Sequence, residues 1–173
     1  MRERIKFEVR PIPARLLKSL GDSLRPYLSE SRVLDLYAGT GSMGLKLLAE
    51  GAATCDFVET NRKLCQSIQA ELKKRAWEGS VCCQSVEEFL KQSEPEAYDI
   101  VLADPPFPLW EDANFTLQFP QDAARLVNKS GLFVMKVPSG LLPPPSICDL
   151  NRKKSSAVGD SQLVYYEAAP NGN

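Results

Sequence analysis

The chain has 173 residues, of which 43% are hydrophobic and 25% charged, and its formal net charge is −1. This composition is typical of a globular protein, contains no apolar run near the roughly 20 residues that cross a bilayer, and excludes a broadly basic surface. The absence of histidine and of any Cys-x-x-Cys pair argues against a metal site. The opening MRERIKFEVRP lacks the apolar segment of a signal peptide, so we expect a cytoplasmic protein.

We expect one domain over residues 1–173, present as a monomer. Residues 1–30 are expected to be a basic, partly helical segment that packs on a sheet, because PARLLKSLGDSLRPYL has leucines at helical spacing. Strands and helices then alternate along the chain. The expected strands are 32–39, 54–60, 81–84, 98–104 and 131–138, and the expected helices are 42–51, 61–77 with Asn61 as N-cap, 85–92, and one from about Pro120.

The C-terminal part breaks this alternation. Residues 138–145 contain four prolines, which predicts a stiff connection rather than a helix. Residues 146–156 and 161–169 alternate polar and apolar side chains across a Gly-Asp turn, which favours an antiparallel hairpin, and 168–173 are expected to be a frayed tail. We therefore predict an α/β fold, a doubly wound, mostly parallel seven-stranded sheet whose ligands lie at the carboxyl ends of the strands.

A glycine pattern at the end of the first strand indicates a ligand. GTGSMG, residues 39–44, matches G-x-G-x-x-G, and Glu59 follows Gly39 by 20 residues, which by itself suggests a dinucleotide. Asp35, inside the preceding strand, suits a cationic ligand better than a pyrophosphate. S-adenosylmethionine is cationic, and its ribose diol can be held by a carboxylate such as Glu59. We expect this cofactor, with an NAD-dependent oxidoreductase as an alternative.

The expected cofactor residues come from three strand ends. Ser85 and Val86 follow the third strand, where Ser85 either meets the adenine amino group or is an ordinary helix cap. The full set is Asp35, Tyr37, Ala38, Gly39, Thr40, Gly41, Glu59, Thr60, Ser85 and Val86.

The segment YDIVLADPPF places Asp104, Pro105, Pro106 and Phe107 directly after the fourth strand. Prolines cannot continue a sheet ladder, so the Pro105 carbonyl stays free and the loop is stiff. The pattern resembles that of amino-methyltransferases, which methylate exocyclic or amide nitrogens. Asp104 and the Pro105 carbonyl would accept hydrogen bonds from the N–H groups of the amino group, and Phe107 would stack on a flat substrate. No cysteine is nearby, which argues against methylation of a pyrimidine carbon.

From Val9 to Tyr166 the chain resembles the RsmD family, bacterial methyltransferases that act on the N2 amino group of a guanine in 16S rRNA. The resemblance rests on VRPIPARLLKSL, VLDLYAGTGSMGLKLLAEGA, FVETN, YDIVLADPPF and LVYYEA. It implies a Rossmann-like class I methyltransferase fold and a 16S rRNA substrate, within the 30S subunit or an assembly intermediate. The chain departs from the family's pattern at Ile12, Pro13, Ala14 and Lys18, and at Ser85 and Lys136, where the family commonly has acids.

Basic residues gather near the N-terminus and in the second expected crossover helix. Such clusters bind phosphates or are simply solvated. The expected RNA-binding residues are Arg10, Arg15, Lys73, Lys74 and Arg75. Two alternatives stay open. One is a methyltransferase for adenine N6 or another amino group, which uses the same motif. The other is a catalytically weak RNA-binding assembly factor, which would suit the segment before Arg10, MRERIKFEV, because it is shorter than the basic, glycine-rich segment of the RsmD family.

Overall fold

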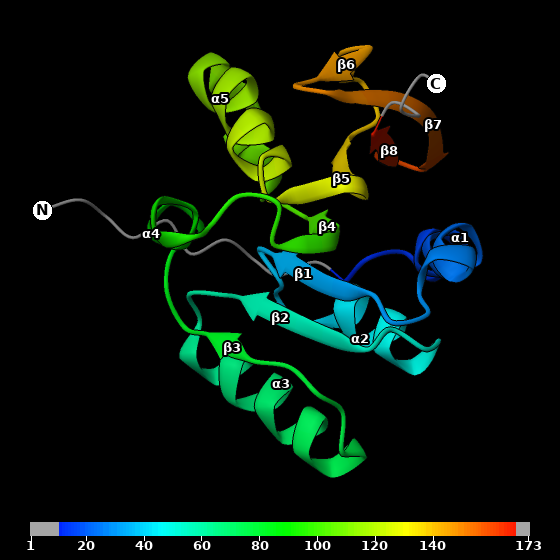
Figure 1. Ribbon diagram of the computed structural model, residues 1–173. Helices are drawn as coiled ribbons and strands as arrows, with labels where there is room; N and C mark the ends of the chain where they lie inside the picture. The colour runs from blue at the N-terminus through cyan, green and yellow to red at the C-terminus, as the bar shows by residue number, and fades with distance from the viewer. Residues whose placement is uncertain (1–10, 169–173) are drawn as a thin grey trace, which may run out of the picture.

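Eight strands form one sheet in the computed structural model, which describes residues 11–168. The order across the sheet is β3-β2-β1-β4-β5-β8-β7-β6 (Figure 1). The strands are β1 Arg32–Leu36, β2 Thr54–Val58, β3 Val81–Cys82, β4 Tyr98–Ala103, β5 Val127–Pro138, β6 Ser146–Ile147, β7 Leu150–Val158 and β8 Ser161–Ala168. The first five are parallel, so their carboxyl ends share one edge, and the chain changes direction across the sheet between β1 and β4.

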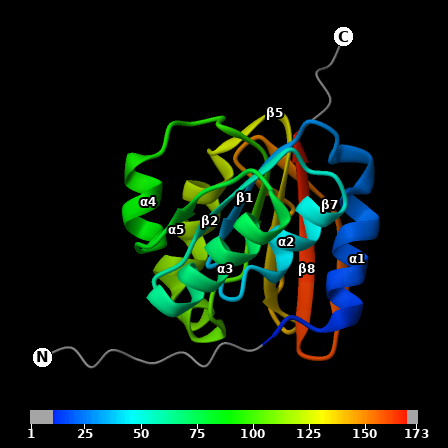
Figure 2. The same cartoon turned by 90° about the horizontal axis from the view of Figure 1, so that it is seen from below.

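Helices cover both faces of the sheet, as a doubly wound fold requires. They are α1 Ala14–Leu24, α2 Ser42–Ala49, α3 Arg62–Arg75, α4 Val86–Gln92 and α5 Ala113–Ala124, with short 3₁₀ helices η1 Arg25–Tyr27 and η2 Phe107–Glu111. α1, α2 and α3 bury their apolar sides in one core, and α4, α5 and η2 in the other. In Figure 2, α4 and α5 lie together on the left and α1 on the right, beside β8. No described helix is long and apolar enough to span a membrane.

Polar side chains start two of the helices at the positions that the sequence signals. Asn61 accepts hydrogen bonds from the backbone N–H groups of Lys63 (3.0 Å) and Leu64 (3.4 Å), which confirms it as the N-cap of α3. Ser85 and Glu88 form a capping box at the start of α4. These caps fix where each helix leaves the edge that carries the strand ends.

The prediction that the last helix begins at about Pro120 is wrong, because α5 begins at Ala113 and contains Pro120 in its interior. Asp112 caps the helix by accepting from the N–H groups of Asn114 (2.8 Å) and Phe115 (3.3 Å). Pro120 cannot donate the backbone hydrogen bond of its turn. Burial of the apolar side of α5 against the sheet offsets that loss.

The sheet has eight strands rather than the predicted seven, because the short β6 adds to the edge beyond β7. The predicted hairpin is confirmed as β7 and β8, joined at Gly159 and Asp160. The proline-rich segment before it forms no helix. Side chains of the sheet hydrogen-bond to its backbone carbonyls: the Tyr166 hydroxyl donates to the Pro144 carbonyl (3.0 Å), and the Arg152 guanidinium donates to the Pro143 carbonyl (2.6 Å).

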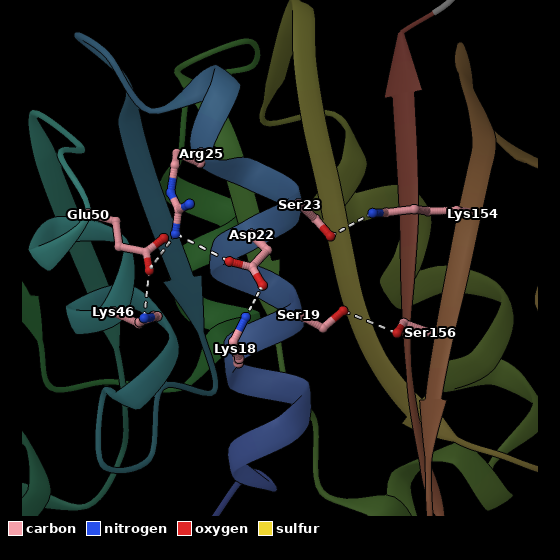
Figure 3. Close-up of polar contacts among 9 residues, drawn as sticks. All are labelled: Lys18, Ser19, Asp22, Ser23, Arg25, Lys46, Glu50, Lys154 and Ser156. Atoms are coloured by element: carbon pink, nitrogen blue, oxygen red, sulfur yellow. Dashed lines mark hydrogen bonds and ion pairs between the residues drawn. The ribbon is translucent and has the colours of Figure 1, made fainter.

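α1 joins the parallel half of the sheet to the hairpin. Its buried leucines pack over the sheet, as predicted, while its polar side contacts α2 on one flank and β7 on the other (Figure 3). Exposed ion pairs of this kind add little stability, but they fix how the helix side chains are arranged. The contacts are Asp22 with Lys18 (2.5 Å) and Arg25 (3.2 Å), Glu50 with Lys46 (2.6 Å) and Arg25 (3.6 Å), Ser23 with Lys154 (2.6 Å), and Ser19 with Ser156 (3.2 Å).

Candidate active site

A cleft of about 780 Å³ lies over the carboxyl ends of the parallel strands, at the point where the strand order reverses. Its walls come from the loops after β1, β2, β3 and β4, from residues 11–13 before α1, and from the turn between β7 and β8. Most of the predicted site residues meet there. They are Tyr37, Ala38, Gly39, Thr40, Glu59, Thr60, Ser85, Val86, Asp104, Pro105, Pro106 and Phe107.

The loop after β1 has a backbone that ordinary side chains rarely adopt. Tyr37, Gly39 and Gly41 have φ angles of 57°, 56° and 75°. The Gly41 N–H donates to the Ala38 carbonyl at 2.7 Å, and a Cβ on Gly41 would lie 2.9 Å from Ile68 of α3. The glycines therefore permit a tight turn between β1 and α2 whose backbone is open to the cleft.

Glu59 links this loop to the loop after β2. One carboxylate oxygen accepts the Gly39 N–H at 2.8 Å and the other accepts the Asn61 N–H at 2.8 Å. The side chain is half-buried and lines the cleft. Each carboxylate oxygen has about two acceptor positions, so acceptor capacity remains for a ligand hydroxyl after both backbone bonds are made.

Asp35 does not line the cleft, so the prediction that it faces a cationic ligand does not agree with the geometry. It is 1% exposed, and its carboxyl accepts the N–H of Gly44 at 2.9 Å, one of the unpaired donors in the first turn of α2. Burial raises its pKa to about 8, the Gly44 N–H opposes this, and the charges of Asp104 and Glu59 add to it. Asp35 thus holds α2 on β1, beneath the glycine loop.

Asp104 is the first residue after β4, and its carboxylate points at a lysine. The Lys136 ammonium on β5 donates to Asp104 at 2.8 Å and lies 5.0 Å from the centre of the Phe107 ring. Burial raises the pKa of the Asp104 carboxyl, and Lys136 opposes that shift. The acid of the Asp-Pro-Pro-Phe segment is therefore paired inside the protein.

The two prolines set the backbone of this loop. Among the described residues no hydrogen bond to the Pro105 carbonyl is formed, whereas the Pro106 carbonyl accepts the Leu109 N–H at 3.0 Å to start η2. A group of aromatic rings supports the loop from behind. Trp110 packs edge-on against Phe115 at 5.4 Å between ring centres, Phe115 stacks on Phe119 at 4.9 Å, and Tyr37 meets Phe119 at 5.4 Å.

Ser85 has the capping role that the sequence left as an alternative. Its hydroxyl accepts the Glu88 N–H at 3.2 Å, while its residue also lines the cleft. Glu87, two positions further on, brings a carboxylate to the same wall. Where the RsmD family commonly has an acid at the position of Ser85, this chain has an acid two residues later, at Glu87.

The predicted RNA-binding residues are not gathered in one place. Arg15 lies in the first turn of α1, in a shallow hollow with Lys18 and Lys154. α3 runs back from the carboxyl ends of the strands to their amino ends (Figure 1), so the basic residues of its last turn lie at the edge opposite the cleft. Those residues are Lys73, Lys74 and Arg75. Arg10 lies outside the described residues.

Sequence reasoning missed several cleft residues. Lys136 was noted only as a departure from a family pattern, and Glu87 not at all. The N-terminal wall, Pro11 to Pro13, is marked only by the departures at Ile12 and Pro13, and the turn at Asp160 and Ser161 has no signal, because each reaches the cleft through packing of distant segments. The alternation of side chains along β5 indicates which face of the sheet Lys136 points to, but it does not indicate that Asp104 is its partner.

The charge of the cleft bears on which cofactor it can hold. Of the described residues that line it, four are acidic and one is basic: Glu59, Glu87, Asp104 and Asp160, against Lys136. Such a lining favours a cation and disfavours a pyrophosphate, so it fits S-adenosylmethionine better than NAD. The volume lies within the range of small-molecule and cofactor sites. Within residues 11–168 no group of three or more His, Cys, Asp or Glu side chains is placed to hold a metal.

A family described as Conserved hypothetical protein 95 matches residues 4–167 of the chain. Ribosomal RNA small subunit methyltransferase D of Escherichia coli (strain K12) is 29% identical over 164 residues, which are 92% of this chain and 81% of that protein. The Haemophilus influenzae protein of the same name is 33% identical over 103 residues, 57% of this chain and about half, 53%, of the relative.

Among solved structures, a T. thermophilus 16S rRNA N2 methyltransferase (RsmC) in complex with AdoMet and guanosine has a TM-score of 0.72 at 22% identity. It covers 96% of this chain and 45% of that chain, and the likeness shows a shared fold. The expected Rossmann-like methyltransferase fold is thus confirmed. Because the family match extends over almost the whole sequence, the chain belongs to the Conserved hypothetical protein 95 family, the RsmD family that its motifs resemble.

Proposed function

We propose that the protein transfers a methyl group from S-adenosylmethionine to the N2 amino group of a guanine in 16S rRNA. One observation carries this proposal: the Asp-Pro-Pro-Phe loop opens into the same acid-lined cleft as the glycine loop and Glu59. The curated relatives are named as methyltransferases and RsmC, which shares the fold, was solved in complex with AdoMet, which supports S-adenosylmethionine as the cofactor. The curated relatives are named as ribosomal RNA small subunit methyltransferases, which supports rRNA as the substrate, and guanine N2 follows from the resemblance to RsmD.

Several residues would hold the cofactor, which supplies an electrophilic methyl group when bound. The backbone of Gly39 and Thr40 is open to the cleft, and the Glu59 carboxylate keeps acceptor capacity for ribose hydroxyls. Ser85 and Val86 line the wall at the third strand end, where a flat adenine can rest. The acidic lining favours the positive charges of the ligand.

The Asp-Pro-Pro-Phe loop would hold the acceptor amino group. The nitrogen of an exocyclic amine is conjugated and is a poor nucleophile, so its lone pair must be aimed at the methyl carbon. Asp104 and the free Pro105 carbonyl accept hydrogen bonds from its two N–H groups and orient it, and Phe107 stacks on the base. These residues can reach the base only if it is unpaired or turned out of its helix.

The hollow between α1 and β7 supports a route for the RNA backbone. Arg15, Lys18 and Lys154 line it, and α1 begins directly after Pro13, which lines the cleft. Basic side chains here would contact phosphates beside the target base.

A protein of net charge −1 has few such contacts, so we expect its affinity for naked RNA to be modest and strongly salt-dependent. A 30S particle would present the guanine already in a fixed, unpaired geometry. A monomeric, cytoplasmic enzyme of one domain stays a prediction.

The test is a methyl-transfer assay on 30S subunits and on protein-free 16S rRNA, both from cells that lack the modification. The methylated nucleoside is then identified by mass spectrometry. We expect N2-methylguanosine, formed faster on the subunits. N6-methyladenosine, or transfer to DNA or a protein amide, would contradict the guanine assignment. Equal or faster transfer to stripped rRNA would contradict the particle as substrate. Tight cofactor binding with no transfer to any RNA would instead support an assembly factor.

A further inference from the structure

Lys136 lies on β5 beside the Asp-Pro-Pro-Phe loop. β4 and β5 are parallel, and Ala103 is opposite Met135, so the next residue on each strand points to the same side. These next residues are Asp104 and Lys136. The sheet register itself therefore brings the lysine to the acid.

The contact between them is built into the protein. Lys136 is only 7% exposed, although lysine is almost never fully buried unless it is paired. Its ammonium donates to one oxygen of Asp104 at 2.8 Å and lies over the ring of Phe107 at 5.0 Å from the centre. One lysine thus touches two residues of the motif and leaves the second carboxylate oxygen of Asp104 for another donor.

The surroundings of Asp104 would otherwise favour its uncharged form. Burial raises the pKa of its carboxyl. The other acidic groups that face it or share its cleft come from four elements: Asp35 on β1, Glu59 after β2, Glu87 in α4 and Asp160 in the β7–β8 turn. Of these, Asp35 has a pKa of about 8 and is mostly uncharged at neutral pH. Among the described residues of the cleft, Lys136 is the only cation that opposes them.

We propose that Lys136 is a positioning residue that keeps Asp104 an oriented, negatively charged acceptor for the amino group of the substrate. A protonated carboxyl offers a weaker acceptor, and its proton would have to point away from the incoming amine. Lys136 itself touches neither the amine nor the methyl group in this role. The inference rests on the proposed amino-group methylation and adds the residue on which the acid depends.

The first test measures the charge of Asp104 without any reaction. Asp104 is titrated by NMR in protein labelled with ¹³C at aspartate carboxyls, with Asp104→Asn to assign the signal. We expect its midpoint to rise by at least about one pH unit in Lys136→Gln, which keeps a donor but loses the charge. Lys136→Arg should keep the midpoint near that of the wild type. An unchanged midpoint in Lys136→Gln would overturn the proposal.

The second test is the pH profile of methyl transfer. In Lys136→Gln the acid limb of the kcat profile should move to higher pH by the same interval as the NMR midpoint. At pH values below the limb, kcat should fall by about tenfold relative to the wild type. At pH values above it, kcat should stay within about twofold of the wild type. The KM for S-adenosylmethionine should change by less than about threefold, and Lys136→Arg should restore the profile. A lower rate at every pH would indicate a merely structural role. A faster enzyme would mean that Lys136 competes with the amine for Asp104.

The two tests separate this inference from the proposed function. A midpoint shift in a protein that methylates no RNA would leave the role of Lys136 in charging Asp104 intact and refute the function. Transfer to rRNA with no shift in either measurement would leave the function intact and refute the role of Lys136. Thermal unfolding of each variant, followed by circular dichroism, shows whether it is folded under the assay conditions.

Discussion

Replacement of Glu59 by alanine should weaken cofactor binding and loosen two loops at once. In the structure its two oxygens accept the Gly39 and Asn61 N–H groups at 2.8 Å each, one of them also accepts the Thr60 hydroxyl at 3.4 Å, and the side chain lines the cleft. A hydrogen bond to a charged group contributes about 1.5–3 kcal/mol. Loss of the ribose contact alone therefore predicts a rise of about 10- to 150-fold in the Kd of S-adenosylmethionine. The bond from Gly39 is partly buried and the bond from Asn61 is exposed, so we expect a stability loss of only about 1–3 kcal/mol.

Isothermal titration of wild type and Glu59→Ala with S-adenosylmethionine measures the first effect, and urea unfolding without the ligand measures the second. Glu59→Gln is the informative companion, because an amide oxygen keeps one acceptor while its NH₂ group faces a backbone donor. It should bind the cofactor no better than the alanine variant. Glu94→Ala, which removes an exposed acid outside the cleft, is the matched control and should change neither quantity. An unchanged Kd in Glu59→Ala would mean that the ribose lies elsewhere.

Three further predictions follow from the site. Asp104→Asn should slow methyl transfer by about 100-fold or more and leave the cofactor Kd within about threefold; near-full turnover in single-turnover assays would contradict its acceptor role. Asp35 has a pKa of about 8 in the folded protein and ionises near pH 4 when the chain is unfolded. The folded state therefore binds the extra proton between these values, and the free energy of unfolding falls as pH rises from 4 to 8, by up to about 1.4 kcal/mol per pH unit. Asp35→Asn should flatten that slope in urea unfolding between pH 5 and 8, and an equal slope would show that Asp35 ionises normally. The double variant Arg15→Glu and Lys154→Glu should lower the rate of transfer to 30S subunits and make its salt dependence less steep, with cofactor affinity unchanged. Lys74→Glu, at the opposite edge, is the control and should have the smaller effect. Equal effects would show that α1 does not carry the RNA contact.

The sequence by itself determined the order of the elements and the place of the motifs. Apolar periodicity separates strands from helices, and side-chain caps such as Asn61 and Ser85 act within a few residues, so both are visible in a short window of sequence. Parallel strands joined by crossover helices bring their carboxyl ends to one edge whatever their side chains are. That is why the glycine loop, Glu59 and the Asp-Pro-Pro-Phe segment were correctly expected to share one cleft.

Only the tertiary structure decided which partner each charged side chain meets. Period-2 alternation cannot tell whether Asp35 faces the cleft or a helix, and the packing of α2 on β1 turns it toward Gly44. The start of α5 before Pro120 depends on burial against the sheet, which local propensity does not register. Lys136 and Asp104 are 32 residues apart and meet because β4 and β5 are neighbours in one register. Such pairings depend on strand order and on desolvation, and both arise only when the whole chain has packed.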